Sequence, residues 1–366
     1  MHIEGEKEAL LEVGQSVLRV VSPRATLPVL GGVKIEAGRD NVKFVATDLE
    51  MFLTVHGDFA VKEQGAVVVP GRLFGDILRN LPSGKVSIRG ADGEVRIEAG
   101  RSEFAVTGFP VADFPSMPEV KESQRCQIAG AELARALRQV VRAASPDEGR
   151  PVLTGVLWSV EGSTLKLVAT DSYRLAVREL VIKEGPDSGT AIIPGRALAE
   201  FGRHLAGIGE DEVSVWLGDS QAVFSAGSTT LVTRLIDGEF PDYRKLIPES
   251  HTKHLKVATE PFAQAVERVG LVARENTPVK IHLGEEVQLT ATEAGVADAW
   301  EALEEVEFEG DPMVIAFNPR FLSDGLEGLE SQTAVMEVTD PARPAVLKGA
   351  EREEFIYLLM PVRLPG

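Results

Sequence analysis

The stretch Leu27-Pro-Val-Leu-Gly-Gly-Val33 returns 123 residues later in the chain as Arg150-Pro-Val-Leu-Thr-Gly-Val156. A second motif keeps the same interval, because Val45-Ala-Thr-Asp48 returns as Val168-Ala-Thr-Asp171, again 123 residues later. Chance does not hold two motifs in one register over such a distance. A period of this length is typical of duplicated domains, and it is too long for the short units of a solenoid.

A third pair of motifs and a more diverged third copy extend the repeat over the whole chain. Val69-Pro-Gly-Arg72 returns as Ile193-Pro-Gly-Arg196 at an offset of 124 residues. In the last third, the same order of motifs is kept by Thr277-Pro-Val-Lys280, Leu289-Thr-Ala-Thr-Glu293 and Ile315-Ala-Phe-Asn-Pro-Arg320. The sequence therefore predicts three copies of one domain.

The predicted domain boundaries lie in two polar stretches that lack an apolar period, 118–127 and 248–256. A chain of 366 residues is too long for one typical hydrophobic core, which agrees with several domains. We expect the domains at residues 1–122, 123–252 and 253–366.

Each copy contains two helical patterns and several strand patterns. Apolar residues spaced by three and four begin each copy, and a second pattern follows each proline-containing motif; together they predict helices at 6–21, 72–81, 132–144, 196–205, 260–274 and 320–329. Apolar and polar residues alternate over 41–55, and over 85–107 around an Asp92-Gly93 turn. The predicted fold class is α+β, with two helices packed on antiparallel sheets in each copy.

Charge is distributed unevenly between the predicted helices and the rest of the chain. The chain carries 38 basic and 56 acidic residues, a net charge of -18, which excludes a protein that coats nucleic acid with its whole surface. The six predicted helices sum to +2, so the remainder carries -20. If homologous helices line one wall, its cations would include Arg135, Arg138, Arg142, Arg196 and Arg203. Such residues bind phosphates without reading bases.

Cysteine and hydropathy patterns exclude several classes of protein. Cys126 is the only cysteine, in a predicted joint, so an intrachain disulfide and a thiolate metal cluster are excluded. There is no apolar stretch that fits a signal peptide or a membrane span. We expect a soluble, cytoplasmic protein without a membrane partner, a metal or a cofactor.

Four stretches, taken together, resemble the bacterial sliding clamp family, the β subunit of DNA polymerase III, over essentially the full chain. They are Arg24-Ala-Thr-Leu-Pro-Val-Leu30, Ala169-Thr-Asp-Ser-Tyr-Arg-Leu-Ala176, Asp237-Gly-Glu-Phe-Pro-Asp-Tyr243 and Leu359-Met-Pro-Val-Arg-Leu364. The resemblance implies a non-catalytic processivity factor that encircles duplex DNA. It also implies a head-to-tail homodimer, six similar domains in a ring with helices inside, and tethering of the replicative polymerase, the clamp loader and other clamp-binding proteins.

A size estimate agrees with a dimeric ring. A domain of about 120 residues has a diameter of roughly 35 Å when treated as a sphere. Three such spheres in a closed ring leave a hole of about 5 Å, and six leave about 35 Å, whereas a duplex is roughly 20 Å wide. Two chains can therefore encircle DNA and one cannot.

By position, the family's DNA-facing residues correspond to Gln15, Arg24, Arg72, Arg150, Arg196 and Arg203. Arg72 and Arg196 each follow Pro-Gly at the start of a predicted helix. A cation there opposes the helix dipole, so a phosphate partner explains these arginines better than helix punctuation does.

The resemblance further implies a hydrophobic pocket between the second and third domains, where short linear peptides of partner proteins bind. Its matching positions are Leu153, Thr170, Ser172, Tyr173, Arg174, Leu175, Pro241, Leu246, Met360, Pro361, Val362 and Arg363. Methionine provides a flexible lining that suits many peptides. Tyr173 departs from the histidine common in the family, and Pro365-Gly366 extends past the usual Arg-Leu ending. Without the resemblance, Met360 and Val362 are typical of a buried C-terminal strand.

The subunit interface of the family would place an edge strand of the first domain against the third domain. The corresponding residues are Phe104, Val106, Leu271 and Val272. Pairing between chains would satisfy the exposed backbone groups of that edge. Phe104 fits the ordinary core of a domain equally well.

Two alternatives remain from the residues themselves. An enzyme is disfavoured: His251 and His254 lie in a polar linker without cysteine, Asp171 and Ser172 fit a turn, and no phosphate-binding or dinucleotide-binding loop is present. The acidic stretch 301–311 fits a strand with a solvated face. A repeat-built protein scaffold that never touches DNA is the second alternative, and the helix charges disfavour it.

Overall fold

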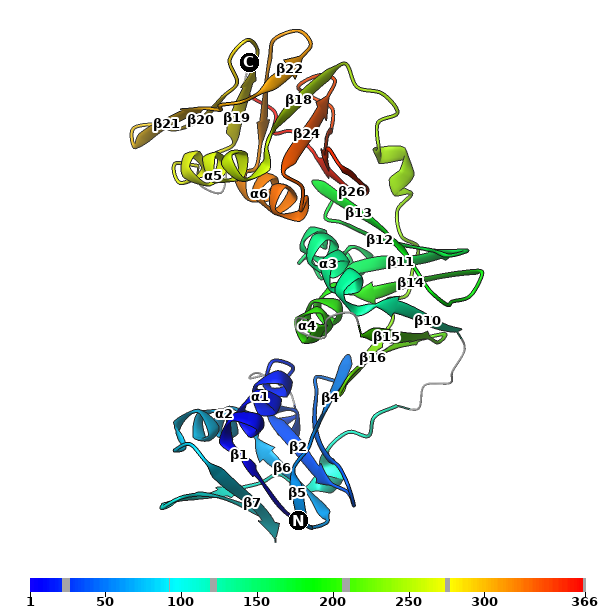
Figure 1. The fold of residues 1–366 in the computed structure, drawn as a ribbon, viewed down its shortest axis with the longest axis vertical. Helices are drawn as coiled ribbons and strands as arrows, with labels where there is room; N and C mark the ends of the chain where they lie inside the picture. Colours follow the sequence, from blue (N-terminus) through cyan, green and yellow to red (C-terminus); the bar gives the residue numbers. More distant parts are fainter. Residues whose placement is uncertain (22–26, 92, 119–123, 206–210, 274–276, 365–366) are drawn as a thin grey trace. The chain divides into compact units, whose positions relative to one another are not determined.

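The computed structural model describes all residues except 22–26, 92, 119–123, 206–210, 274–276 and 365–366. The same order of elements occurs three times along the chain: a strand, a helix, four or five strands, a second helix and three strands (Figure 1). The first repeat contains β1 (His2–Glu6), α1 (Lys7–Leu18), β2 (Gly32–Ala37), β3 (Val42–Thr47), β4 (Met51–Gly57), β5 (Ala60–Glu63), β6 (Gly65–Pro70), α2 (Gly71–Asn80), β7 (Lys85–Ala91), β8 (Glu94–Ala99) and β9 (Ser102–Thr107).

The second and third repeats follow the same plan. The second contains β10 (Gln124–Ala129), α3 (Gly130–Val140), β11 (Gly155–Glu161), β12 (Thr164–Thr170), β13 (Arg174–Val181), β14 (Ser188–Pro194), α4 (Gly195–Leu205), β15 (Glu212–Leu217), β16 (Gln221–Ala226) and β17 (Thr229–Arg234). The third contains β18 (Lys253–Ala258), α5 (Thr259–Gly270), β19 (Val279–Leu283), β20 (Gln288–Glu293), β21 (Ala297–Ala302), β22 (Glu307–Glu309), β23 (Met313–Phe317), α6 (Pro319–Gly328), β24 (Thr333–Val338), β25 (Ala345–Gly349) and β26 (Arg352–Leu359).

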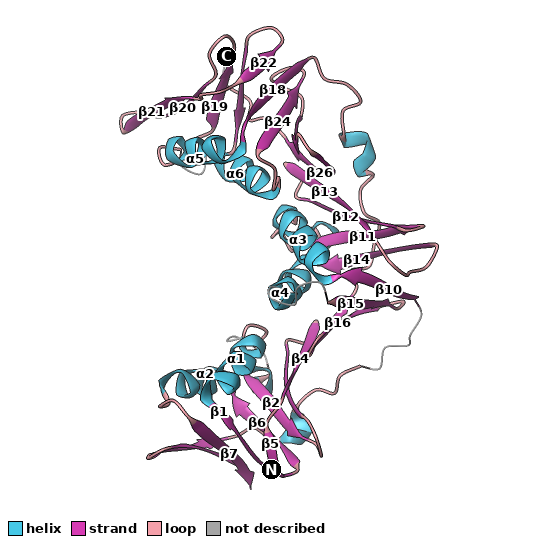
Figure 2. Cartoon of the chain, in the orientation of Figure 1, coloured by secondary structure: helices cyan, strands magenta, loops and turns pink. Residues whose placement is uncertain are grey.

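All six predicted helices are confirmed, with ends that shift by a few residues. The helix predicted at 132–144 ends as an α-helix at Val140 and continues as a 3-10 turn, Val141–Ala143. Apolar faces explain the helices: α5, for example, buries Phe262, Val266 and Val269 against the sheets. In the N-terminal half α1 and α2 lie beside each other, and in the C-terminal half α5 and α6 do the same (Figure 2).

The turn before each of β4, β13 and β21 repeats in backbone detail. Leu49, Ser172 and Gly295 occupy it with φ angles of 76°, 79° and 75°. Glycine adopts this left-handed conformation freely, whereas a residue with a side chain pays roughly 1–3 kcal/mol. The first two repeats therefore keep the turn despite the strain.

Every repeat divides its strands between two half-sheets. The first strand of a repeat and its last three strands form one half-sheet, as in β1-β7-β8-β9. The middle strands form the other half-sheet, as in β21-β20-β19-β23. All pairs between named strands in the described chain are antiparallel, as predicted. The hairpin β7–β8 closes at Gly93, whose φ of 80° suits the predicted turn.

Half-sheets of neighbouring repeats join edge to edge. β17 pairs with β4, which places Leu231 opposite Leu53 and makes one eight-stranded sheet. β26 pairs with β13, which places Tyr357 opposite Ala176 and makes one nine-stranded sheet. Each junction is thus an ordinary antiparallel strand pair between two repeats.

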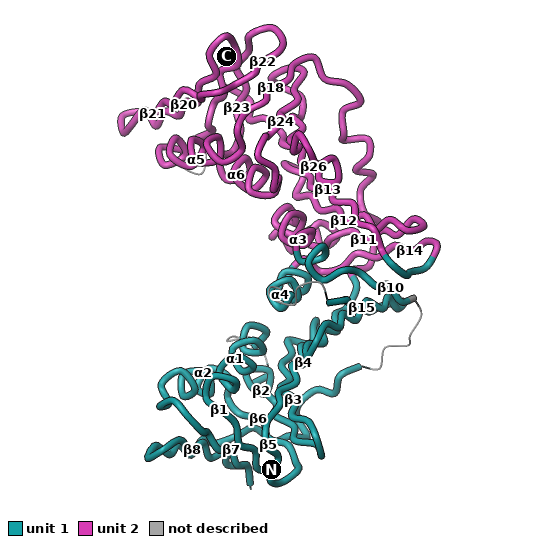
Figure 3. The backbone as a smooth tube through the Cα atoms, in the orientation of Figure 1, with its two compact units in different colours: residues 1–134, 183–186, 196–235 teal, residues 135–182, 187–195, 236–366 magenta. Residues whose placement is uncertain are grey.

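These continuous sheets divide the described chain into two compact units (Figure 3). Unit 1 comprises 1–134, 183–186 and 196–235, and unit 2 comprises 135–182, 187–195 and 236–366. The division passes through the second repeat because its two half-sheets belong to different continuous sheets. The boundaries 1–122, 123–252 and 253–366 follow sequence repetition and stay a prediction.

One local prediction is wrong, and two stretches gain detail. The polar stretches predicted as joints contain the first residues of strands that begin at Gln124 and Lys253, and Cys126 lies buried in β10, where burial raises the pKa of its thiol. The acidic stretch 301–311 holds the end of β21 and the three-residue β22 instead of one strand. Periodicity misleads here because charged side chains on an edge strand and on a loop look alike in sequence.

Candidate functional site

Two of the arginines predicted to contact DNA project from α4 in unit 1. The side chains of Arg196 and Arg203 are 64% and 55% exposed. Arg196 Nη1 lies 2.7 Å from Asp48 Oδ2, and Arg203 Nη2 lies 2.6 Å from Glu200 Oε2. Both cations are accessible to an external phosphate, and both already have a carboxylate partner within the chain. Asp48 therefore stabilises Arg196 at the start of α4 even without a phosphate.

The remaining predicted DNA contacts differ in their surroundings. Gln15 on α1 and Arg72 on α2 are exposed, on helices that contact each other in unit 1. Arg150 in unit 2 pairs with Asp147 and donates a 3.0 Å hydrogen bond to the Ser172 hydroxyl. It therefore lies beside a residue of the predicted peptide pocket. Arg24 lies outside the described residues.

The three arginines of the α3 segment contact carboxylates on α6 or just after it within unit 2. Arg135 and Arg138 both reach Glu330, and Arg142 contacts Asp324 and Glu327. Carboxylates about 190 residues later in sequence therefore reduce the positive charge that these arginines present, and their place on one wall stays a prediction.

The predicted peptide pocket combines a buried frame with an exposed apolar surface in unit 2. Leu175 and Tyr243 belong to one apolar cluster, and Leu153 and Thr170 are buried. The pocket positions that expose much of their surface are Ser172, Tyr173, Pro241, Leu246, Met360, Val362 and Arg363, while Pro361 is half-buried.

Two backbone hydrogen bonds hold the C-terminal end of the chain at this surface. Met360 N donates to the carbonyl of Tyr173 at 2.8 Å, and Val362 N donates to the carbonyl of Ala316 at 2.7 Å. Met360 is 43% exposed and follows the last residue of β26. The alternative that Met360 and Val362 form a buried strand is therefore wrong.

Arg174 takes a structural position within this predicted pocket. Its side chain is 6% exposed and donates to Asp171 Oδ2 at 3.0 Å, to the Tyr357 hydroxyl at 3.2 Å and to Asp324 on α6. Its guanidinium also lies 4.4 Å from the Phe321 ring centroid. Arg174 therefore supports the frame of the pocket and does not present its charge at the surface.

Strands β9 and β21 are the free edges near the predicted subunit interface. Phe104 on β9 is half exposed, whereas Val106 is buried within unit 1. Leu271 is 82% exposed directly after α5, and Val272 is half-buried. Sequence reasoning missed Trp300, which is 71% exposed on β21, although an exposed tryptophan in an alternating strand is the available signal.

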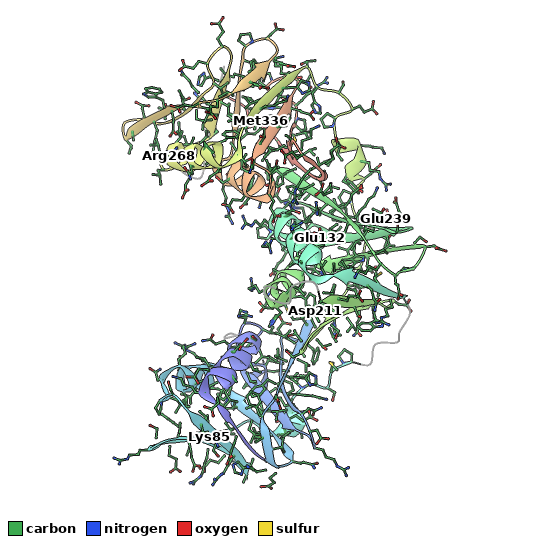
Figure 4. The ribbon with its side chains drawn as sticks, in the orientation of Figure 1. Lys85, Glu132, Asp211, Glu239, Arg268 and Met336 are labelled. Carbon is green, nitrogen blue, oxygen red and sulfur yellow. The ribbon has the colours of Figure 1, made fainter. Side chains whose placement is uncertain are left out.

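An ion pair links β21 to helix α5. Arg268 on α5, labelled in Figure 4, donates from Nε to Glu301 Oε2 at 3.0 Å. The hydrogen bonds from Arg268 lower the pKa of Glu301 and keep it ionised. Figure 4 also labels Met336, a buried residue of β24 in unit 2.

The residues considered for catalysis have structural partners. Asp171 Oδ1 accepts hydrogen bonds from the backbone N–H groups of Tyr173 and Arg174, which confirms a turn. His251 is nearly buried with Nδ1 3.4 Å from Glu337, so it is no solvated linker residue. Among the described residues, no group of three metal-binding side chains is found, and no helix is both long and apolar enough to cross a bilayer.

Three family models match consecutive parts of the chain. They are the N-terminal, central and C-terminal domains of the DNA polymerase III beta subunit, at residues 1–118, 127–242 and 244–363. The "Beta sliding clamp" of Streptomyces coelicolor is 36% identical over 381 residues, covering 100% of both chains. That of Staphylococcus aureus is 32% identical over 358 residues, covering 94% of this chain and 95% of the relative.

Solved structures give the same result. The DNA polymerase sliding clamp of Bacillus subtilis superposes with a TM-score of 0.91 at 31% identity, and both chains are covered fully. A sliding clamp of Pseudomonas aeruginosa bound to griselimycin superposes with a TM-score of 0.92 at 30% identity, again with full coverage of both chains. The likeness extends over every repeat.

Proposed function

This chain belongs to the family of bacterial sliding clamps, the β subunits of DNA polymerase III, and is a non-catalytic DNA sliding clamp of that polymerase. From that premise we propose that two copies join head to tail into a closed ring around duplex DNA. Each copy contributes three domains, and the helices line the hole. The observation that carries this proposal is a pair of free sheet edges, β9 and β21.

The two internal junctions supply the model for the contact between copies. β17 and β26 end the second and third repeats, and each pairs with the neighbouring repeat through β4 or β13. β9 is their counterpart in the first repeat, and β21 is the counterpart of β4 and β13 in the third. Among the described strands, β9 and β21 each form an edge of their own sheet. Pairing β9 of one copy with β21 of another repeats the junction and removes both edges.

The internal junctions also predict the register of this contact. Leu231 lies opposite Leu53, and Tyr357 lies opposite Ala176. The preceding strand of each hairpin identifies equivalent residues in β9, β17 and β26, because Ile97 pairs with Phe104, Phe224 with Leu231 and Leu347 with Tyr357. In the same way, β4, β13 and β21 are aligned by the pairs Ala46 with Leu53, Ala169 with Ala176 and Ala291 with Ala299. By this equivalence, Phe104 of one copy lies opposite Ala299 of the next, and Ala105 lies opposite Asp298.

A cysteine pair tests the dimer and its register together. The double variant Ala105→Cys with Asp298→Cys should form a covalent dimer on mild oxidation, because directly opposed residues have Cβ atoms about 5 Å apart. Ala105→Cys with Glu301→Cys is the matched control, since it lies three residues out of register. Cys126 is buried and should not react. Native mass spectrometry of the unmodified protein should show twice 39.4 kDa. A monomer, or equal cross-linking in both variants, would exclude this interface.

For the inner wall, we infer that Gln15, Arg24, Arg72, Arg196 and Arg203 contact phosphates, with Arg150 nearby. The exposed side chains of Arg196 and Arg203, on a helix whose counterparts occur in every repeat, support this assignment. Contacts to phosphates alone leave the clamp free to move along any sequence. A closed ring must also be opened by another protein, so we infer a separate loader, and cytoplasmic action on the chromosome.

For the partners, we infer that the exposed surface of Tyr173, Leu246, Met360 and Val362 binds linear peptides of the polymerase and of other clamp-binding proteins. The support is an apolar surface, flexible at methionine, that rests on the buried cluster of Leu175 and Tyr243. The proteins that dock there would share one motif, because a single pocket per chain has to accept them in turn.

A further inference from the structure

A short segment follows the last strand of the first and second repeats and covers part of a sheet. We call residues 114–117 the first strap, which covers β2, β3, β4 and β17 in unit 1. We call residues 243–247 the second strap, which packs on β11, β12, β13 and β26 in unit 2. The two straps occupy equivalent places, since Phe114 and Tyr243 are the buried aromatic residue of each.

The space beneath the two straps is filled differently. Beneath the second strap, apolar side chains including Leu157, Val168 and Val177 form a continuous cluster with Tyr243. Beneath the first strap lies a cavity of about 300 Å³. Its size reaches the lower end of the range for ligand pockets.

Substitution at equivalent strand positions explains the difference. Lys34 stands where the second repeat has Leu157, and Thr54 stands where it has Val177, each at the repeat interval of 123 residues. Thr230 on β17 stands where β26 has Ile356, next to the equivalent pair Leu231 and Tyr357. Polar side chains therefore replace apolar ones at these three positions. Partial burial of polar groups is unfavourable for folding, so this lining favours a role in binding.

Positive charge predominates in this cavity. Lys34, Lys43 and His56 line it, together with one carboxylate, Glu36, which lies 3.2 Å from Lys34. Lys43 has no ion-pair partner among the residues that the structure describes. Burial, and then the charge of Lys43 directly opposite in the strand pair, lower the pKa of His56. An acidic group that enters the cavity would therefore meet unpaired donors.

Apolar side chains line another part of the same cavity. Val45 contributes from β3, and Phe114, Pro115 and Met117 contribute from the strap. Met117 is exposed at the rim and can adjust to different side chains. The lining therefore suits an acidic group that carries an apolar neighbour, and a small inorganic anion would leave the apolar wall unused.

We propose that the cavity beneath the first strap is a second docking site, for a linear peptide of a partner protein in which an acidic residue adjoins a large apolar one. The peptide carboxylate binds Lys43 and its neighbours Lys34 and His56, and the apolar side chain packs on Phe114 and Met117. This site lies in unit 1 and shares no residue with the peptide pocket proposed in unit 2. One clamp could thus hold two partners through different motifs.

The charge of the site is tested by fluorescence anisotropy with labelled acetyl-Ser-Glu-Phe-Glu-Ser-amide. Lys43→Gln should weaken binding at least tenfold. Lys166→Gln is the matched control, because Lys166 occupies the equivalent strand position and already pairs with Glu179 at 3.2 Å. It should bind like the unmodified clamp, as should Met360→Ala. Equal loss in both lysine variants, or equal affinity for a peptide with Gln in place of Glu, would overturn the proposal.

The shape of the site is tested by giving it the lining of the second repeat. The triple variant Lys34→Leu, Thr54→Val and Thr230→Ile should lose peptide binding and unfold at a higher temperature, because apolar side chains fill the cavity. A destabilised triple variant would contradict the equivalence of the two sites, and retained binding would contradict the location. Inorganic phosphate is the remaining probe. If phosphate binds with the same Lys43 dependence and the peptide does not, the site is a simple anion site and the peptide proposal is wrong.

The pH dependence provides a further readout. The charged groups that line the cavity with His56 are Lys34, Glu36 and Lys43, from β2 and β3, while β17 and the strap contribute none. A bound carboxylate favours the protonated imidazole, so peptide affinity should rise as the pH falls from 7.5 to 6. His56→Asn should remove this dependence, and an unchanged pH profile in that variant would exclude the predicted contact.

Discussion

The two junctions between repeats use the same strand pairing but bury opposite charges. At the junction in unit 1, Glu200 of α4 is 4% exposed and accepts from Arg19 Nε at 2.6 Å and from Arg203 Nη2 at 2.6 Å. At the junction in unit 2, the buried group is the guanidinium of Arg174, held by Asp171, Asp324 and the Tyr357 hydroxyl. One junction is centred on an acid and the other on a base.

Two junctions with the same strand pairing can therefore lose stability through different changes. A carboxylate can be neutralised by acid, whereas an arginine stays charged at any pH that a protein meets. Burial alone would raise the pKa of Glu200, but hydrogen bonds from Arg19 and Arg203, together with His204 Nε2 at 3.6 Å, outweigh burial and lower the pKa to about 2. We therefore expect strong acid to weaken the junction in unit 1 by neutralising Glu200, and truncation of Arg174 to weaken the junction in unit 2.

The largest effect is expected for Arg174→Ala. Removal of the guanidinium leaves Asp171 and Asp324 without their main partner, and breaking a buried pair in this way typically costs about 3–5 kcal/mol. Hydrogen exchange should show the loss in β13, β26 and α6, with protection of the junction in unit 1 unchanged. Arg174→Lys is the matched control and should recover part of the protection. Uniform loss over both units would mean that the junctions are not independent.

A smaller effect is expected when the pH falls. The pKa of Glu200 is about 2 in the folded chain against an ordinary value of 4.5, so its contribution is present above pH 4.5 and disappears as the pH falls toward 2. A shift of this size corresponds to on the order of 3 kcal/mol. Urea unfolding at pH 5 and pH 3 should show about half of this loss, and Glu200→Gln should flatten the difference. If Glu200→Gln keeps the full pH dependence, another carboxylate is responsible.

The repeat plan could be predicted from sequence because it rests on local patterns. The helix starting at Gly195 follows a strand that ends in proline and keeps one apolar face, and the motif interval of 123 residues aligns its counterparts. The pocket positions around Leu175 came from the family resemblance, and two of them, Met360 and Tyr173, are joined by a backbone hydrogen bond.

The charge partners could not be predicted, because they depend on distant contacts. Arg142 meets Glu327, 185 residues later in sequence, and Arg196 meets Asp48, 148 residues earlier. No periodicity records such a pair, so arginines that looked available for phosphate turned out to be partly neutralised. The free edges β9 and β21 likewise follow from the order of strands in the sheets, which a single sequence does not display.

We expect DNA binding to depend on Arg196 and Arg203, and Arg203 also pairs with Glu200 at the junction in unit 1. Arg196→Glu with Arg203→Glu should weaken duplex binding by roughly tenfold or more and reduce its salt dependence, because phosphate contacts are lost. Arg343→Glu with Lys245→Glu changes the charge equally at exposed positions of unit 2 and serves as control. Loading of both double variants onto nicked circular duplex DNA measures the effect, and native mass spectrometry checks that each variant is still a dimer. Unchanged loading of the first variant would favour a scaffold that does not contact DNA.

The smallest effect is expected for Met360→Ala, at the end of the strand that forms the junction in unit 2. Met360 is fixed through its backbone to Tyr173, while its side chain is half exposed, so truncation should leave folding almost unchanged. Loss of its flexible apolar contact should weaken binding of a polymerase-derived peptide by several-fold, on the order of 1 kcal/mol. Isothermal titration separates this from an effect on stability. Equal affinity would place the pocket elsewhere, whereas a loss of unfolding temperature would show that Met360 belongs to the junction itself.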